Sequence, residues 1–279
     1  MRVLLFYFFL WVVLNGCGGA SNGHSTSLIP DEPPIKDGSW YRPSAFVTWQ
    51  WQLEGNINTS YTVEIYDVDL FDTPLATIQE IQSAGKRVIC YFSGGSYEEF
   101  RDDKDKFFPE DLGNTLEGWA DERWLDIRSS NVHSIMLDRL DLAKQKGCDG
   151  VEPDNMDGYI NITGFSLTSS DQLAFNRFIA NEAHTRDLSV GLKNDLDQIS
   201  ELVDYYDFSV NEQCFEYHEC STLMPFINNG KPVLNAEYLD RYITDLAARN
   251  TLCTESLNLG FSTLILPLGL NDSFRYSCL

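Results

Sequence analysis

Basic side chains are scarce in this sequence. Its 20 Lys and Arg residues stand against 42 Asp and Glu residues, which gives a formal net charge of −22. Such a chain is unsuited to nucleic acid, because phosphate backbones are held mainly by Lys and Arg. The charge favours either a cationic partner or simple solubility of an acidic surface.

Motifs of several common enzyme classes are also missing. The chain has no Gly-x-Gly-x-x-Gly or Walker-type loop, which removes the commonest nucleotide-binding folds. It has no Gly-x-Ser-x-Gly elbow, so a serine hydrolase of the α/β type is not expected. Cys214, His218 and Cys220 lack zinc-type spacing and a fourth ligand. We therefore expect neither a metal nor a cofactor.

One long apolar run is present, at the N-terminus. Residues 3–14 are twelve uninterrupted apolar residues after a basic one, which is shorter than the ~20 residues of a membrane-spanning helix. This pattern predicts an export signal. The segment that follows, 14–17, resembles a bacterial lipobox. We expect a lipoprotein-type signal peptide over 1–16, with lipidation of Cys17 in the bacterial cell envelope. The alternative is an ordinary secretory signal cleaved near Ala20, which would release the protein.

The remaining cysteines are even in number, as expected for an exported protein with up to three disulfides. Fifteen connectivities are possible for six cysteines. We favour the pairs Cys90–Cys148, Cys214–Cys220 and Cys253–Cys278.

Beyond a Gly-, Ser- and Pro-rich flexible tether over 17–38, strand and helix patterns alternate through one domain, 39–279. Strands are predicted at 45–51, 62–68, 87–93, 150–154, 188–193, 206–210, 232–236 and 262–267. Helices are predicted at 74–84, 132–146, 170–185, 196–203, 221–229 and 240–250, with a polar-aromatic insertion at 97–126. Alternating strands and helices predict a parallel sheet, and eight strands in ~240 residues favour a (β/α)8 barrel.

Polar and aromatic side chains gather where the predicted strands end, and in such barrels the chemistry lies at the carboxyl ends of the strands. Asp154 and Glu212 end the fourth and sixth strands, so their side chains can converge across the mouth. Glycosidic bond cleavage needs two such carboxyl groups, one to protonate the leaving oxygen and one to attack or to activate water. The candidate substrate contacts are Trp51, Asp67, Asp69, Tyr91, Glu152, Asn155, Asp157, Lys193, Asn194 and Glu237.

Three of these candidates have alternative interpretations. Glu152 shares the parity of Asp154 one layer deeper, and a buried structural acid is as good an interpretation as substrate binding. We expect one of Asp67 and Asp69 to contact substrate and the other to be structural. Lys193 is expected to pair with a carboxylate, and the alternative is a Schiff-base lyase or aldolase.

Five segments in the same order resemble glycoside hydrolase family 114, the endo-α-1,4-polygalactosaminidases and their relatives. They are 88–96 (VICYFSGGS), 124–128 (WLDIR), 146–155 (KGCDGVEPDN), 191–195 (GLKND) and 211–215 (NEQCF). The resemblance spans residues 40 to 245 and implies a (β/α)8 barrel that cleaves α-1,4-linked galactosamine polymers with retention.

The same resemblance implies that Asp154 is the nucleophile and Glu212 the acid/base. It also explains the charge, because a galactosamine polymer without acetyl groups is a polycation that an acidic enzyme attracts. The alternative function is a barrel that binds aminosugar polymer without cleaving it. We expect a monomer that contacts no nucleic acid and meets the membrane only through its lipid anchor.

Overall fold

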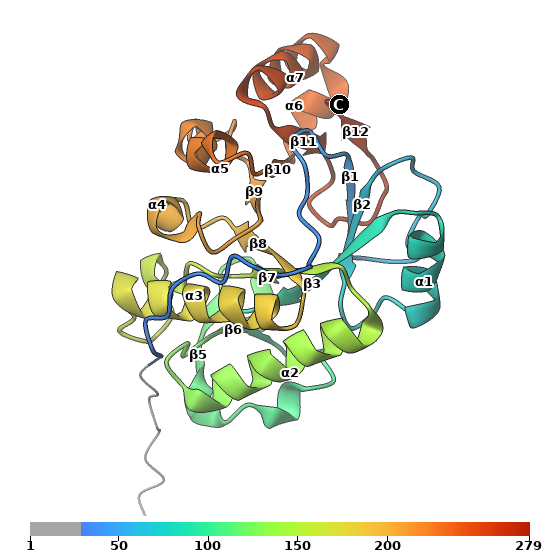
Figure 1. Ribbon diagram of the computed structural model, residues 1–279. Coiled ribbons are helices and arrows are strands. Elements are labelled where there is room, and N and C mark those ends of the chain that lie inside the picture. Colours follow the sequence, from blue (N-terminus) through green and yellow to red (C-terminus); the bar gives the residue numbers. More distant parts are fainter. Residues whose placement is uncertain (1–28) are drawn as a thin grey trace, which may run out of the picture.

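The computed structural model describes residues 29–279, so the predicted signal peptide over 1–16 and Cys17 lie outside the described residues. Eight parallel strands form a curled sheet with helices on its outside, which is the expected (β/α)8 barrel (Figure 1). In pairing order they are β1 (Trp49–Gln52), β2 (Ile65–Asp69), β3 (Arg87–Ser93), β7 (Gly150–Asp154), β8 (Ser189–Lys193), β9 (Phe208–Glu212), β10 (Val233–Glu237) and β11 (Ser262–Ile265).

All eight predicted strands are present, and β3 and β7 have the predicted bounds. The largest shift is in the first strand, which was predicted from residue 45 and begins at Trp49. Phe46 has a φ of 57°, and the Val47 N–H donates to the Ser44 carbonyl at 3.2 Å. A turn therefore occupies the start of the apolar run, because a left-handed residue interrupts an extended strand.

The barrel closes between β1 and β11 through side chains. Within residues 29–279 no strand pairing joins these two strands, and the short strand β12 (Tyr276–Ser277) pairs antiparallel with β11 instead. The indole N–H of Trp49 donates to the Ser262 carbonyl at 2.8 Å, and the Arg275 guanidinium donates to the Trp49 carbonyl at 2.7 Å. These bonds satisfy backbone groups that a strand ladder would otherwise pair.

Six of the eight barrel strands are followed by a helix, and β10 is followed by two. The helices are α1 (Leu75–Ser83), α2 (Ser130–Lys146), α3 (Ser169–Thr185), α4 (Ile199–Leu202), α5 (Met224–Asn228), α6 (Asp240–Thr244) and α7 (Leu246–Leu259). The two longest, α2 and α3, lie side by side on the outside of the sheet (Figure 1). Thr168 and Asp171 form a capping box at the start of α3, and Ser129 caps α2, so both helices begin at strong sequence signals.

The predicted helix over 240–250 is in fact two helices. Asp245 leaves the helical conformation, with φ −107° and ψ 104°, and its carboxylate accepts the N–H groups of Ala247 and Ala248. An Asp side chain in this position satisfies backbone donors that have no partner within a helix, so it starts a new helix. α7 then continues nine residues past the predicted end, to Leu259.

The predicted insertion over 97–126 forms a small sheet of its own. Strands β4 (Ser96–Glu98), β5 (Leu112–Leu116) and β6 (Trp119–Leu125) pair antiparallel in the order β4-β6-β5. Short 3₁₀ turns (Lys104–Lys106 and Pro109–Asp111) connect β4 to β5. Because β4 follows β3 directly, this sheet extends from the carboxyl end of a barrel strand.

The end of the predicted tether packs on the barrel. Asp31 forms an ion pair with Arg177 at 2.7 Å, and the Ile35 N–H donates to the Asn181 side chain at 3.0 Å. Both partners belong to α3, along which this segment runs (Figure 1). The prediction of a flexible tether is therefore wrong for residues 29–38, since backbone and side-chain bonds hold this part against the domain.

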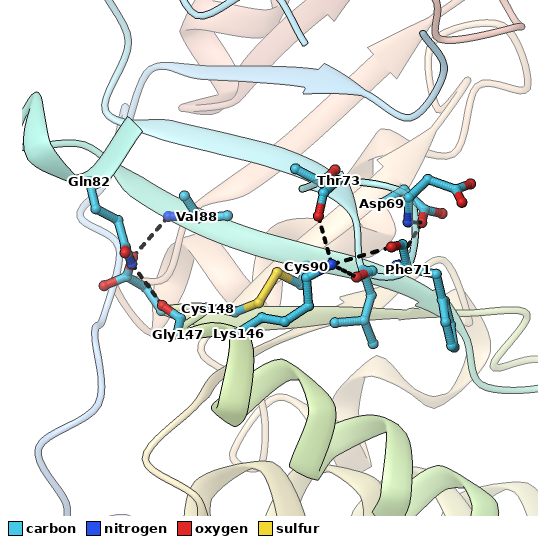
Figure 2. The surroundings of a disulfide bond; sticks show 12 residues. Asp69, Phe71, Thr73, Gln82, Val88, Cys90, Lys146, Gly147 and Cys148 are labelled. Carbon is cyan, nitrogen blue, oxygen red and sulfur yellow. Dashed lines mark hydrogen bonds between the residues drawn. A yellow bond between two sulfur atoms is a disulfide. The ribbon is translucent and has the colours of Figure 1, made fainter. Parts of the chain in front are cut away.

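The three favoured disulfides, Cys90–Cys148, Cys214–Cys220 and Cys253–Cys278, are confirmed. Figure 2 shows the Cys90–Cys148 disulfide beside the ammonium group of Lys146. It joins β3 to Cys148, which lies two residues before β7. Lys146 donates to the carbonyls of Leu70 and Thr73, both at 2.6 Å, and so fixes the loop after β2. In the part of the chain described here, every helix is too short or too polar to cross a membrane.

Candidate active site

A cavity of about 690 Å³ opens at the carboxyl ends of the barrel strands. β2, β3, β7, β8 and β9 contribute side chains to one side of it, and the β4-β6-β5 sheet contributes the other. This is the end of the barrel at which catalytic groups are found in enzymes of this architecture.

Lys193 lies at the bottom of the cavity and holds three carboxyl groups together. Its Nζ atom is 3.0 Å from Asp154 Oδ1, 3.3 Å from Glu152 Oε1 and 3.4 Å from Glu212 Oε2. The side chain is 2% exposed and lies over the Trp51 ring, at 4.9 Å from the ring centre. β8 lies between β7 and β9, so one lysine reaches the acids on both neighbouring strands.

Asp154 is held as a carboxylate. Burial opposes its ionisation, but the nearby Lys193 ammonium, the hydrogen bond from that ammonium, the N–H of Asn155 and the Tyr91 hydroxyl outweigh burial and lower its pKa below the usual range. The Tyr91 hydroxyl donates to Oδ2 at 2.9 Å and the Asn155 N–H donates to Oδ1 at 2.8 Å. A carboxylate with these donors keeps a fixed orientation and a negative charge at neutral pH.

Glu212 is positioned by groups from both adjacent strands. The Tyr238 hydroxyl donates to Oε1 at 2.6 Å, and the Asn194 amide donates to Oε2 at 3.2 Å. The Asn194 side-chain oxygen also accepts the Glu212 N–H at 3.1 Å. Asn194 and Gln213 have left-handed backbone conformations, which turn the chain at the ends of β8 and β9.

Tyr238 was missed by the sequence analysis, which selected its neighbour Glu237. Glu237 is fully buried and accepts the Phe215 N–H at 2.9 Å and the Asn235 amide at 3.2 Å. Burial raises its pKa to about 7. The signal for Tyr238 was present, because it directly follows a strand, as Asn155 and Asn194 do.

A buried layer of acids lies below Lys193. Asp67 and Glu152 are both 0% exposed. Burial and then the Glu152 charge raise the pKa of Asp67 well above its usual range, while burial, opposed by Lys193, raises the pKa of Glu152 to about 7. A raised pKa keeps Asp67 protonated, which leaves this pair with at most one negative charge, and one buried charge costs less free energy than two.

Four of the predicted substrate contacts are wrong, because they are buried and cannot be reached from the cavity. Trp51, Asp67, Glu152 and Glu237 are at most 1% exposed and do not line the cavity. A ligand cannot touch them unless the barrel rearranges. Trp51, Asp67 and Glu152 support the site from below, whereas Glu237 lies on the face of β10 that is turned away from the barrel interior. The remaining candidates do line the cavity: Asp69, Tyr91, Asn155, Asp157, Lys193 and Asn194. Asp69 is ion-paired to Arg101 at 2.7 Å.

The β4-β6-β5 sheet supplies lining residues that the sequence analysis did not identify. Trp119, Glu122 and Trp124 of β6 face the cavity, together with Thr115 of β5. Their sequence signal was weak because the five residues of β5 have no regular alternation of buried and exposed positions.

The cavity is strongly acidic. Nine carboxylate side chains line it against two cationic ones. The acids are Glu54, Asp69, Asp72, Glu98, Glu117, Glu122, Asp154, Asp157 and Glu212, and the cations are Arg101 and Lys193. Both cations are already ion-paired within the protein, so the excess negative charge faces whatever enters.

Comparisons with known proteins agree with this geometry. The model of glycoside-hydrolase family GH114 matches residues 31–279. The crystal structure of Aspergillus fumigatus Ega3 in complex with galactosamine is 45% identical, with a TM-score of 0.82, and the match covers 87% of this chain and 99% of that chain. The glycoside hydrolase domain of PelA from Pseudomonas aeruginosa is 13% identical, with a TM-score of 0.64, over 83% of this chain and 97% of that domain; it shows the shared fold alone. No curated protein matches the chain.

Proposed function

Because the chain belongs to glycoside hydrolase family 114, we propose that it hydrolyses α-1,4-linked galactosamine-containing polysaccharide, with Asp154 as the nucleophile and Glu212 as the general acid/base. The observation that carries this proposal is the shared contact of both carboxyl groups with the Lys193 ammonium. Two carboxyl groups at one point of an open cavity are the arrangement that glycosidic cleavage requires.

The geometry supports a retaining mechanism. Asp154 Oδ1 and Glu212 Oε2 lie 3.0 and 3.4 Å from the same nitrogen atom, so their separation is at most the sum of these two distances. For this pair of oxygen atoms the limit falls just short of the ~6.5 Å at which the carboxyl separations of inverting enzymes begin, and the ~5–5.5 Å of retaining enzymes lies within it. The distances therefore agree with direct attack by one carboxylate.

The hydrogen bonds favour one assignment of roles. Lys193 is closer to Asp154 and donates a hydrogen bond to it, which keeps Asp154 ionised and suited to attack. In the first step Asp154 bonds to the anomeric carbon while Glu212 gives its proton to the departing glycosidic oxygen. In the second step Glu212 takes a proton from water, and the resulting hydroxide displaces Asp154. Both side chains return to their starting states.

The acidity of the cavity supports a cationic substrate. A galactosamine polymer without acetyl groups carries ammonium groups near neutral pH, and a cleft of opposite charge raises its local concentration. Ega3, which is 45% identical, is described in complex with galactosamine.

Export is also part of the proposal, with Cys17 as the lipidation site and a monomer as the working form. The three disulfides support export because such bonds persist in oxidising compartments.

The proposal is tested by incubating the protein with de-acetylated α-1,4-galactosamine polymer and measuring new reducing ends, with products identified by mass spectrometry. We expect cleavage by the natural chain and a loss of at least ~10³-fold in kcat for Asp154→Asn and for Glu212→Gln. Thermal unfolding of the variants is the control for folding. Full activity in either variant would contradict the assignment. Binding of polymer by the natural chain without new reducing ends would favour the alternative, a non-catalytic polymer-binding barrel.

A further inference from the structure

Glu122 is a carboxylate on the inserted sheet that faces the cavity without a cation. It lies on β6, lines the cavity and is 9% exposed. Within residues 29–279 no ion pair includes it. Its cross-strand neighbour in the antiparallel sheet is a second acid, Glu98 of β4. Like charges directly opposite each other in a sheet are destabilising.

Glu98 and Glu122 differ in how their charge is compensated. Glu98 accepts two hydrogen bonds from the Arg101 guanidinium, at 2.7 and 2.8 Å, and lies 3.7 Å from Arg139. Glu122 has only the Ser96 hydroxyl, which donates to Oε2 at 2.7 Å. Burying a charge without a counter-ion costs stability. Arg101 and Arg139 lie within ion-pair distance of Glu98, whereas the Arg101 charge reaches Glu122 only from farther away. Folding alone therefore does not account for Glu122.

A chain of hydrogen bonds fixes the position of Glu122 relative to the catalytic strand. The Ser93 and Ser96 hydroxyl oxygens are 2.6 Å apart, and the Asn155 amide donates to both, at 3.0 and 3.2 Å. Asn155 directly follows Asp154, and its own N–H donates to Asp154. The donors run toward Glu122, which is the terminal acceptor of the chain. Its orientation is therefore tied to the end of β7.

We propose that Glu122 binds the ammonium group of a galactosamine residue in the cavity and thereby selects free-amine sugars over N-acetylated ones. The missing counter-ion of Glu122 then arrives with the substrate, and an ammonium–carboxylate bond is stronger than a neutral hydrogen bond. An acetamide group can donate one N–H but brings no charge. Burial raises the pKa of Glu122 to about 7 with the help of the Glu98 and Asp154 charges, although the Ser96 hydrogen bond and the Arg101 charge lower it. A bound ammonium would favour the ionised form.

This inference rests on the proposed function, and the test separates the two. Steady-state kcat and KM are measured on a free-amine α-1,4-galactosamine oligomer for the natural chain, Glu122→Gln, Glu122→Asp and the matched control Glu99→Gln. Glu99 directly follows β4 of the same sheet, is exposed and does not line the cavity. The N-acetylated oligomer is added as a competitive inhibitor.

We expect Glu122→Gln to raise KM for the free-amine oligomer at least ~10-fold. The inhibition constant of the acetylated oligomer for Glu122→Gln should differ from that for the natural chain by no more than about twofold. Glu122→Asp should recover part of the loss, and Glu99→Gln should stay within about twofold on both ligands. The melting temperature of Glu122→Gln should equal or exceed that of the natural chain, because an uncompensated buried charge is removed; a purely structural Glu122 predicts a lower one.

Equal weakening of both oligomers, or a KM change no larger than that of Glu99→Gln, would overturn the role of Glu122 and leave the proposed function intact. If the acetylated oligomer inhibits neither protein, the KM comparison with Glu99→Gln decides. No cleavage of the free-amine oligomer by the natural chain would instead count against the proposed function.

Discussion

On the floor of the cavity one lysine is surrounded by three carboxyl groups, whereas on the inserted wall Glu122 faces the same cavity without a cation. The floor is built from barrel strands. Lys193 and Glu152 are buried there, and the same ammonium holds Asp154 and Glu212, which are 19% and 26% exposed, so these groups are fixed before substrate arrives. Fixed, compensated charges suit catalysis, because nothing has to reorganise when charge develops in the transition state. An uncompensated charge on the wall suits recognition of a cation. The floor of the cavity thus carries the reactive groups, and the wall selects the substrate.

Replacing Lys193 with Met is expected to have the largest effect on the floor of the cavity. The change leaves Glu152, Asp154 and Glu212 near one another without their shared cation. We expect kcat to fall by at least ~10³-fold and the free energy of unfolding by about 3–5 kcal/mol, the usual effect of removing one partner of a buried ion pair. Activity assays and urea unfolding measure the two effects. The control is Lys106→Met, at an exposed ion pair with Asp138; similar losses in both variants would contradict the special role of the floor.

Removing the Tyr238 hydroxyl tests how the floor orients the acid/base. Tyr238→Phe deletes the 2.6 Å hydrogen bond to Glu212 Oε1 and keeps the ring. We expect kcat to fall about tenfold, as for the loss of a hydrogen bond to a charged group, with KM nearly unchanged. Tyr217→Phe, at an exposed tyrosine, is the control. A rise in KM at constant kcat would show instead that Tyr238 belongs to the binding side of the comparison.

The pH dependence of stability gives the smallest and most selective effect. The folded-state pKa of Glu122 is about 7, above the ~4.3 of an unfolded glutamate. Between these values the folded chain binds the extra proton, so the contribution to stability is fully present below about pH 4 and is lost as the pH rises through about 7. We expect the unfolding free energy to decrease from pH 5 to pH 8, and to decrease less steeply in Glu122→Gln than in Glu99→Gln. Parallel curves for the two variants would refute a buried, uncompensated Glu122.

The sequence predicts the floor of the site far better than the wall. Asp154 and Glu212 could be placed because parallel barrel strands carry their functional groups at one end, and short apolar runs mark where β7 and β9 end. Lys193 was expected to pair with a carboxylate for the same reason. The wall depends on β4, β5 and β6, which form a small, partly exposed sheet, and burial alternates over only three residues in β4 and in the second half of β6. Glu122 therefore gave no signal in the sequence.

Depth within the barrel was the other property that the sequence did not resolve. Asp67 and Glu152 have the parity of the barrel interior, yet they lie one layer below the cavity and act as buried supports. Glu237 fails for a different reason, because Leu234 and Ala236 of β10 face the interior and Glu237 alternates with them. Parity tells which face a side chain takes but not its height along the barrel axis. The split between α6 and α7 was missed for a different reason, because a capping Asp245 in the middle of a helical pattern can equally be an exposed helix residue.

Trapping a covalent intermediate tests the central claim, that Asp154 attacks the sugar with the assistance of Glu212. The Glu212→Gln variant is mixed with an α-galactosaminyl fluoride, whose leaving group needs no proton, so that the intermediate forms but its hydrolysis lacks a base. Peptide mass spectrometry should find one galactosamine unit on the peptide that contains Asp154, and none when Asp154→Asn is added. An adduct on a different carboxylate, or turnover of the fluoride by the double variant at the rate of Glu212→Gln, would contradict the account.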